Sequence, residues 1–407
     1  MALSFPTSLR QSISSNPFSL FLQRQPKPYH HSIGNPTPYQ FDASPSLASN
    51  PGARRRIHLT VSAKKKAVIE GVSEELNKIA GLNLDFAPAR RRVRSAFADA
   101  QQQLDHCLFK SAPPGIRTRE WYEINLRGLE IFLKSWIPER GAKIKGSLFF
   151  CHGYGDTCTF FFEGIARRIA AAGYAVYAMD FPGFGLSEGL HGYIPNFDDL
   201  VDDVIEQYNK IKGRPELKGL PHFLLGQSMG GAVALKIHLK EPRGWDGVLL
   251  VAPMCKIAEG VKPKPEVLKV LGLLSKVIPK AKLGPGQDLD ELMFRELRKR
   301  RMAPYNVICY SDRVRLRTGM ELLRATGDIE SRLGEVCAPL LILHGAEDKV
   351  TDPLVSQFLY KQASSTDKTL KLYEGSYHSI LEGEPDERIF SIFDDIVCWL
   401  NSRSSNN

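Results

Sequence analysis

Residues 223–235 read Phe-Leu-Leu-Gly-Gln-Ser-Met-Gly-Gly-Ala-Val-Ala-Leu, an apolar run that gives way to small, helix-favouring residues. This order predicts a strand, a very tight turn and a helix, with Ser228 at the turn. A nucleophile held in such a turn has a strained backbone, so the positions two before and two after it must lack bulk. Gly226 and Gly230 meet this requirement. The sequence therefore predicts that the Ser228 side chain projects from the turn, with no bulky neighbour, as a nucleophile.

Two further side chains follow in the order that a serine nucleophile needs. The hydroxyl requires a histidine to take its proton and an acid to orient that histidine. Asp348 follows a buried-strand run that begins at 341, and His378 follows the next strand-like stretch, 370–373. Because open sheets bind ligands at the carboxyl ends of their strands, Ser228, Asp348 and His378 are predicted to meet there as a catalytic triad. Asp352, in the same loop, is the first candidate for the triad acid in place of Asp348.

An oxyanion hole completes this chemistry. It needs two backbone N–H groups, one from the residue after the nucleophile and one from a loop after an upstream strand. The strand-like run 148–151 and the loop 152–155 supply the second group. We expect the amides of Met229 and Tyr154 to be the two donors. His152 and His344 are expected to brace loops, Asp180 to be structural because it precedes the nucleophile, and Cys151 to belong to the core.

Residues 1–63 differ in composition from the rest of the chain. They are rich in Ser and Pro and carry six basic residues but a single acid, Asp42. Such acid-poor, Ser-rich arms are typical of organelle transit peptides, and we expect a disordered chloroplast transit peptide. The alternative is a disordered tail without a targeting signal, on a cytoplasmic protein. Without this arm 48 basic and 44 acidic residues remain, so the net charge falls from +9 to +4.

Composition also limits the classes of function. At 407 residues and 43% hydrophobic content, the chain can bury one large core. No apolar run reaches the ~18 residues of a membrane span, and no basic patch interleaved with aromatics indicates a nucleic-acid partner. Seven irregularly spaced cysteines favour a reducing compartment over a disulfide framework.

The remainder divides into four predicted parts. Residues 64–118 form an N-terminal helical extension in which 68–110 are expected to be helix, with an apolar stripe that docks on the body of the protein; a membrane-surface helix is the alternative. Residues 119–253 form the first part of an α/β core and begin with a hairpin that turns at Arg127-Gly128. Residues 254–315 form a cap inserted over the nucleophile, and residues 316–407 complete the core.

The cap contains an apolar segment, 267–278, flanked by lysines that include Lys264, Lys269 and Lys276. One interpretation is a lid whose apolar side faces a lipid substrate and whose lysines meet anionic head groups at a membrane surface. The other is ordinary cap core with solvated lysines. Both remain open at the level of the sequence.

Several spaced motifs together resemble a known family. They are the 152–156 loop His-Gly-Tyr-Gly-Asp, the glycine-punctuated loop 180–187, the Ser228 turn, residues 321–324 and the segment 344–353. From about Arg119 to Ser402 the chain is similar to the monoacylglycerol lipase (lysophospholipase-like) branch of the serine α/β-hydrolases, and in particular to its plant branch, which includes caffeoylshikimate esterase. Gln227 departs from the His or Glu of many relatives, and the cap matches only loosely.

The resemblance implies an α/β-hydrolase fold, with a mostly parallel eight-stranded sheet, helices on both faces and a helical cap after strand 6. It maps the family's triad onto Ser228, Asp348 and His378 and its oxyanion amides onto Tyr154 and Met229. The implied activity is hydrolysis of monoacylglycerol or lysophospholipid esters through an acyl-enzyme, with no metal or cofactor. The alternatives are an esterase for aromatic acyl esters such as caffeoyl shikimate, and a hydrolase-fold ligand receptor with weak catalysis.

Overall fold

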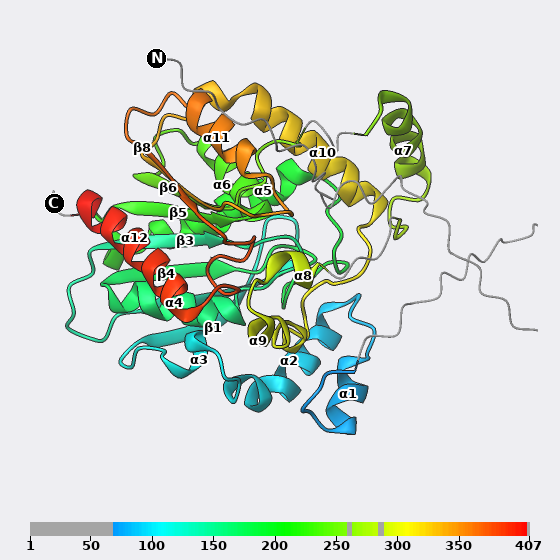
Figure 1. The fold of residues 1–407 in the computed structure, drawn as a ribbon, viewed down its shortest axis with the longest axis horizontal. Helices are drawn as coiled ribbons and strands as arrows, with labels where there is room; N and C mark the ends of the chain where they lie inside the picture. The colour runs from blue at the N-terminus through cyan, green and yellow to red at the C-terminus, as the bar shows by residue number, and fades with distance from the viewer. Residues whose placement is uncertain (1–67, 259–262, 284–288, 405–407) are drawn as a thin grey trace, which may run out of the picture.

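The computed structural model describes residues 68–258, 263–283 and 289–404 (Figure 1). The arm predicted over residues 1–63 lies outside the described residues. None of the helices within the described ranges is long and apolar enough to span a membrane.

An eight-stranded sheet forms the centre of the molecule, with the strand order β1-β2-β4-β3-β5-β6-β7-β8. β1 and β2 form the predicted antiparallel hairpin and β2 is antiparallel to β4, whereas all other neighbours are parallel. The predicted fold class is therefore confirmed. The strands are β1 (Arg117–Ile124), β2 (Glu130–Ile137), β3 (Gly146–Cys151), β4 (Tyr174–Met179), β5 (His222–Gln227), β6 (Gly247–Val251), β7 (Leu340–Gly345) and β8 (Lys368–Tyr373).

Helices cover both faces of the sheet, because successive residues of each central strand point to opposite sides. Leu224 of β5 faces one core and its neighbours Phe223 and Leu225 face the other. The first core is closed by α5 (Phe197–Lys212), α6 (Met229–Lys240), α10 (Leu316–Ser331) and α11 (Pro353–Gln362). The second is closed by α4 (Phe161–Ala171), α12 (Asp386–Ser404) and the N-terminal extension (Figure 1). Short 3-10 turns lie at Pro215–Leu217, Ala303–Tyr305 and Leu333–Glu335.

The extension consists of three helices, so the expectation of helix throughout 68–110 is wrong. They are α1 (Glu74–Ala80), α2 (Ala87–Gln102) and α3 (Cys107–Lys110). α1 ends at Gly81, and Pro88 lies in the first turn of α2, where proline is tolerated because its missing N–H has no helical partner there. His106 caps α3 by accepting a hydrogen bond from the Leu108 amide.

The expected docking of this extension is confirmed. Val93 and Phe97 of α2 and Leu108 of α3 are completely buried and belong to the same core as α4 and α12. Arg90 is also fully buried. The extension is therefore packed as part of the body of the protein.

The cap lies between β6 and β7, as predicted. Its described helices are α7 (Pro265–Val277), α8 (Asp290–Met293) and α9 (Leu297–Arg300). α7 packs against α10, and Figure 1 shows it at the outer end of that helix, away from the sheet. The segment from α8 to Tyr310 lies closer to the body, where its backbone contacts two of the loops described next.

Candidate active site

Ser228 lies between the end of β5 and the start of α6 and has the strained backbone that the sequence predicted. Its φ is 53° and its ψ is −118°. A Cβ on Gly226 would lie 2.4 Å from the Gly230 carbonyl oxygen, and one on Gly230 would lie 1.8 Å from the carbonyl oxygen of Cys151. The Ser228 amide donates to the Val251 carbonyl at 2.9 Å. Neighbouring strands therefore hold the turn in a conformation that glycine alone permits at both flanking positions.

The loop after β3 lies directly against this turn. A Cβ on Gly153 would approach the Ser228 Cβ to 3.5 Å. Met229 is the first residue of α6, so its N–H has no acceptor within the helix and is free to bind an oxyanion. Tyr154, which follows Gly153, carries the other predicted donor. The structure thus brings the loop after β3 into contact with the Ser228 turn.

His152 braces the oxyanion loop. Its ring is completely buried; Nδ1 donates to the Gly153 carbonyl at 2.8 Å, and Nε2 accepts from the Phe181 amide at 3.0 Å. Burial lowers the pKa of His152, which keeps the ring neutral. Two buried groups therefore fix both its tautomer and its orientation.

Asp348 and His378 form a buried pair beside the sheet edge. The distance between Asp348 Oδ2 and His378 Nδ1 is 2.7 Å. The other oxygen of Asp348 accepts from the amides of Val350 and Thr351 at 2.7 and 3.0 Å. Burial alone would raise the pKa of Asp348, but the neighbouring His378 and the hydrogen bonds from His344 and His378 hold it well below its usual range. The carboxylate therefore stays ionised.

His344, a β7 residue, fixes the same carboxylate. Its Nε2 donates to Asp348 Oδ2 at 3.0 Å, while its Nδ1 contacts the Ser356 hydroxyl at 2.7 Å. His344 was expected to brace a loop, and it does so by holding the carboxylate of Asp348 directly.

The pKa of His378 is raised above the ordinary histidine value. Burial of the ring opposes the charged form, but the carboxylate of Asp348, its hydrogen bond and the charge of Glu382 outweigh burial. Ser228 and His378 are not joined by a hydrogen bond in the described part of the chain. In free hydrolases this contact often tightens only when substrate binds.

The other residues that the sequence analysis considered have structural roles. Asp352 caps α11, where its carboxylate accepts from the Leu354 amide at 2.9 Å. Asp180 is completely buried and ties two loops together by accepting from the amides of Cys158 and Leu186 at 2.8 and 2.7 Å. Cys151 is buried in the core, and burial raises the pKa of its thiol.

Sequence reasoning missed Glu382, which joins the two halves of the site. Its Oε1 accepts from Gln227 Nε2 at 2.9 Å, so the loop that carries His378 is bonded to the residue before Ser228. Its main-chain oxygen accepts from His106 Nε2, in the extension, at 2.8 Å. The unusual Gln at position 227 was the one available signal.

The cap is also bonded to both catalytic loops. Toward the His378 loop, the Ser379 amide donates to the Met293 carbonyl, and the Glu296 amide donates to the Gly383 carbonyl, both at 3.0 Å. Toward the oxyanion loop, the Tyr310 amide donates to the Gly155 carbonyl at 2.7 Å. The stretch 293–310 therefore helps to position the site.

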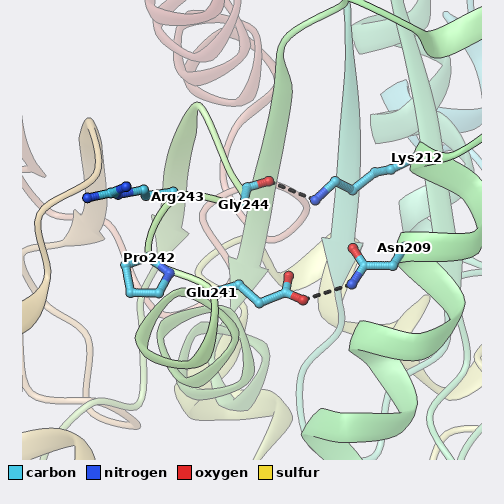
Figure 2. Close-up of a pocket in the computed structure, with 6 residues that line it drawn as sticks. All are labelled: Asn209, Lys212, Glu241, Pro242, Arg243 and Gly244. Atoms are coloured by element: carbon cyan, nitrogen blue, oxygen red, sulfur yellow. Dashed lines mark hydrogen bonds between the residues drawn. The ribbon is translucent and has the colours of Figure 1, made fainter.

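A surface pocket lies elsewhere (Figure 2). Its lining residues lie at the ends of α5 and α6 and in the segment before β6. This is the end of the strands opposite to the Ser228 turn. Within it Asn209 donates to Glu241 at 2.8 Å and Lys212 donates to the Gly244 carbonyl at 2.7 Å, as the dashed lines in Figure 2 mark. Asn209 and Lys212 are thus both hydrogen-bonded within the pocket, and the pocket holds none of the triad residues.

Comparison with known proteins agrees with this geometry. Residues 142–386 match the Hydrolase_4 family, described as serine aminopeptidase S33. The chain is 34% identical to caffeoylshikimate esterase of Arabidopsis thaliana over 290 residues, which cover 71% of this chain and 87% of that protein. It is 32% identical to human monoglyceride lipase over 290 residues, which cover 69% and 90% of the two chains.

Among solved structures, the monoglyceride lipase of Saccharomyces cerevisiae, determined with a substrate analogue, superposes with a TM-score of 0.62. At 22% identity, with 70% of this chain and 94% of that chain covered, this likeness concerns the fold. The family match and the two relatives carry the assignment of class. The chain belongs to the Hydrolase_4 family of serine α/β-hydrolases and is a carboxylic-ester hydrolase similar to the monoglyceride lipases and caffeoylshikimate esterase.

Proposed function

We propose that the chain hydrolyses monoacylglycerol or lysophospholipid esters through an acyl-enzyme on Ser228. The observation that carries the proposal is the strained Ser228 turn, flanked by the Gly153 loop and served by the buried Asp348–His378 pair. The monoglyceride lipases among the relatives support the substrate class.

In the proposed mechanism, His378 accepts the proton of Ser228 as its oxygen attacks the ester carbonyl. Asp348 holds the imidazole in the correct tautomer and stabilises its cation. The amides of Tyr154 and Met229 receive the oxyanion, and losing one such donor typically costs roughly 10²–10³ in rate. His378 then protonates the departing alcohol, and water reverses the sequence to release the acid. No step requires a metal or a cofactor.

Replacement of the nucleophile tests this mechanism. Purified Ser228→Ala should lose hydrolysis of a p-nitrophenyl acyl ester and labelling by a fluorophosphonate probe. The exposed Ser364, in the loop between α11 and β8, provides the control, and Ser364→Ala should be labelled like the parent. Equal hydrolysis by parent and Ser228→Ala would refute the assignment.

Membrane contact through α7 is part of the proposal. Leu273 and Val277 are 65% and 78% exposed, whereas Ser275 between them is buried. Lys269 and Lys276 of the same helix are exposed, as is Lys264 at its N-cap. A face with large exposed apolar side chains and nearby lysines suits the surface of an anionic bilayer, from which a monoacyl lipid could enter the site.

A second candidate substrate is an ester of an aromatic acid, because the Arabidopsis relative at 34% identity is a caffeoylshikimate esterase. The discriminating experiment compares kcat/KM for monooleoylglycerol with that for a caffeoyl ester. Activity on the caffeoyl ester alone would reject the lipid assignment.

We further propose that residues 1–63 direct the protein to the chloroplast, on the basis of their Ser-rich, acid-poor composition. Thylakoid and envelope membranes would supply acyl lipids there. Fusion of these residues to a fluorescent reporter tests the address, and a cytosolic signal would refute it.

A further inference from the structure

Glu382 is a buried carboxyl group that the mechanism above does not use, although it lies four positions after the catalytic histidine. Its side chain is 5% exposed. Oε1 accepts from Gln227 Nε2, whereas Oε2 makes no well-aligned hydrogen bond within the described residues, although the nearby Ser379 hydroxyl helps to lower the pKa of the carboxyl. A buried carboxyl oxygen without a partner is costly, so its presence beside the active site needs an explanation.

The hydrogen bond to Gln227 spans 155 positions and links two separate loops. Gln227 is the last residue of β5 and is covalently bonded to Ser228, whereas Glu382 belongs to the same loop as His378. The distance between the nucleophile and its base depends on the relative position of these loops. The Gln227–Glu382 bond is the direct side-chain link across them.

The extension fixes the other end of this link. His106 Nδ1 accepts from the Leu108 amide at 3.1 Å, so the proton lies on Nε2, which donates to the Glu382 carbonyl at 2.8 Å. Burial lowers the pKa of His106 to about 4, so the ring remains neutral at ordinary pH. The main chain of Glu382 is therefore anchored while its side chain reaches the nucleophile turn.

The groups around Glu382 leave its carboxyl between the protonated and the ionised form near neutral pH. Burial and the neighbouring Asp156 raise the pKa of Glu382 to about 7, against the opposing effects of Gln227 and His378. Farther along the loop the charges are already paired, because Lys299 lies 2.6 Å from Asp386 and Arg295 lies 3.6 Å from Glu384. The charge of Glu382 adds to the larger effect of Asp348 in raising the pKa of His378.

We propose that Glu382 is a positioning residue for the catalytic pair: it holds the Ser228 turn against the His378 loop through Gln227, and its negative charge stabilises the His378 imidazolium. This inference rests on the proposed function of Ser228 and His378. The two roles are separable, since the first needs only an acceptor atom and the second needs the charge.

The decisive variant is Glu382→Gln, whose amide oxygen still accepts from Gln227 but carries no charge. The measurement is the pH dependence of kcat/KM for a soluble short-chain p-nitrophenyl ester. Loss of the negative neighbour should move the acid limb, which reports His378, to lower pH and reduce the high-pH plateau by about threefold to tenfold. Glu347→Gln, an exposed charge removed next to Asp348, is the matched control and should leave the profile unchanged.

The positioning role is tested by breaking the hydrogen bond from each side. Gln227→Met and Glu382→Met should each lower kcat with little change in KM, and the double variant should be no slower than the slower single variant, because both remove one link. Thermal unfolding of each variant establishes that it is folded.

The outcomes are distinct. An acid limb of Glu382→Gln that coincides with the parent's, or a rate lowered by one factor at every pH, would overturn the charge role. Fully additive losses in the double variant would overturn the link. A parent that is not labelled by a fluorophosphonate would instead refute the proposed function and this inference with it, whereas a labelled parent with an unshifted Glu382→Gln profile would refute the inference alone.

Discussion

The Nε atom of Arg90 donates a hydrogen bond to the carbonyl oxygen of Gly185 at 2.5 Å, although the two residues are 95 positions apart. The same guanidinium donates to carbonyls of Leu84 and Asp85 on its own side and of Ser187 on the other. A buried, planar cation thereby joins the extension to the loop that follows β4. Its pKa is lowered to about 10, chiefly by burial, yet it remains charged.

Arg90→Met should therefore destabilise the protein by roughly 3–5 kcal/mol, because it leaves several buried carbonyls without donors. The neighbouring Arg92 is exposed on the same helix, and Arg92→Met should change stability by less than about 0.5 kcal/mol. Chemical denaturation of the two variants provides the comparison. Equal stabilities would mean that the extension is not fixed by this cation.

Asp348 and Asp352 offer a test within a single loop. Asp348→Asn should lower kcat by about 10⁴-fold, as expected when the carboxylate that orients a catalytic histidine is lost. Asp352→Asn should retain activity, since that side chain caps α11. Steady-state kinetics on a soluble ester distinguish them, and a large loss from Asp352→Asn alone would reverse the assignment of the acid.

Two glycines should respond in opposite ways to alanine. Gly230→Ala places a Cβ 1.8 Å from the Cys151 carbonyl oxygen and should prevent assembly of the nucleophile turn, abolishing soluble active enzyme. Gly327 is exposed within α10 and has no atom within 4 Å of an added Cβ. Gly327→Ala should raise stability by about 0.5–1 kcal/mol, because alanine loses less entropy in a helix. Soluble yield and thermal unfolding report both effects.

The face of α7 should matter for lipid surfaces and not for soluble esters. We expect Leu273→Ser/Val277→Ser to reduce turnover of monooleoylglycerol in anionic vesicles severalfold while a soluble p-nitrophenyl ester is cleaved at the parent rate. Leu354→Ser, at a residue 65% exposed on α11, is the matched control. Equal vesicle activity in the double variant and the control would exclude α7 as a membrane contact.

Glu382 also predicts how stability depends on pH. Its pKa is about 7 in the folded protein, above the ordinary glutamate value of 4.5, so the folded state binds the proton more tightly than the unfolded state does. This contribution to stability is fully present below pH 4.5 and is lost as the pH rises through about 7. A difference of about 2.5 pKa units corresponds to about 3 kcal/mol. Relative to the parent, Glu382→Gln should therefore gain stability between pH 5 and pH 8; parallel melting curves would contradict this.

The sequence predicted those parts of the molecule that depend on neighbours along the chain. The apolar run before Ser228 and its flanking glycines predict the strand, turn and helix, because the strain is local to five residues. The strand that ends before Asp348 was equally clear from its burial pattern. The boundaries that divide the extension are also marked locally, because α1 ends at Gly81 and Pro88 lies in the first turn of α2, but the apolar stripe led to the expectation of continuous helix.

Long-range polar pairs, in contrast, could not be predicted from neighbours along the chain. Nothing near Gln227 indicates that its amide meets Glu382, since the contact exists only after β5 and the loop beyond β8 have reached the same sheet edge. Likewise, Arg90 resembles its neighbours in the sequence, the half-buried Arg91 and the exposed Arg92. Its burial follows from the position of the loop after β4, which local propensity does not encode.

The hydrogen bonds of Met293, Glu296 and Tyr310 tie the stretch 293–310 of the cap to the loops that carry His378 and Gly155. Exchange of the whole insertion between homologues would therefore remove the supports of the base and of the oxyanion loop. Chimeras that graft only the portion around α7 should preserve the catalytic machinery.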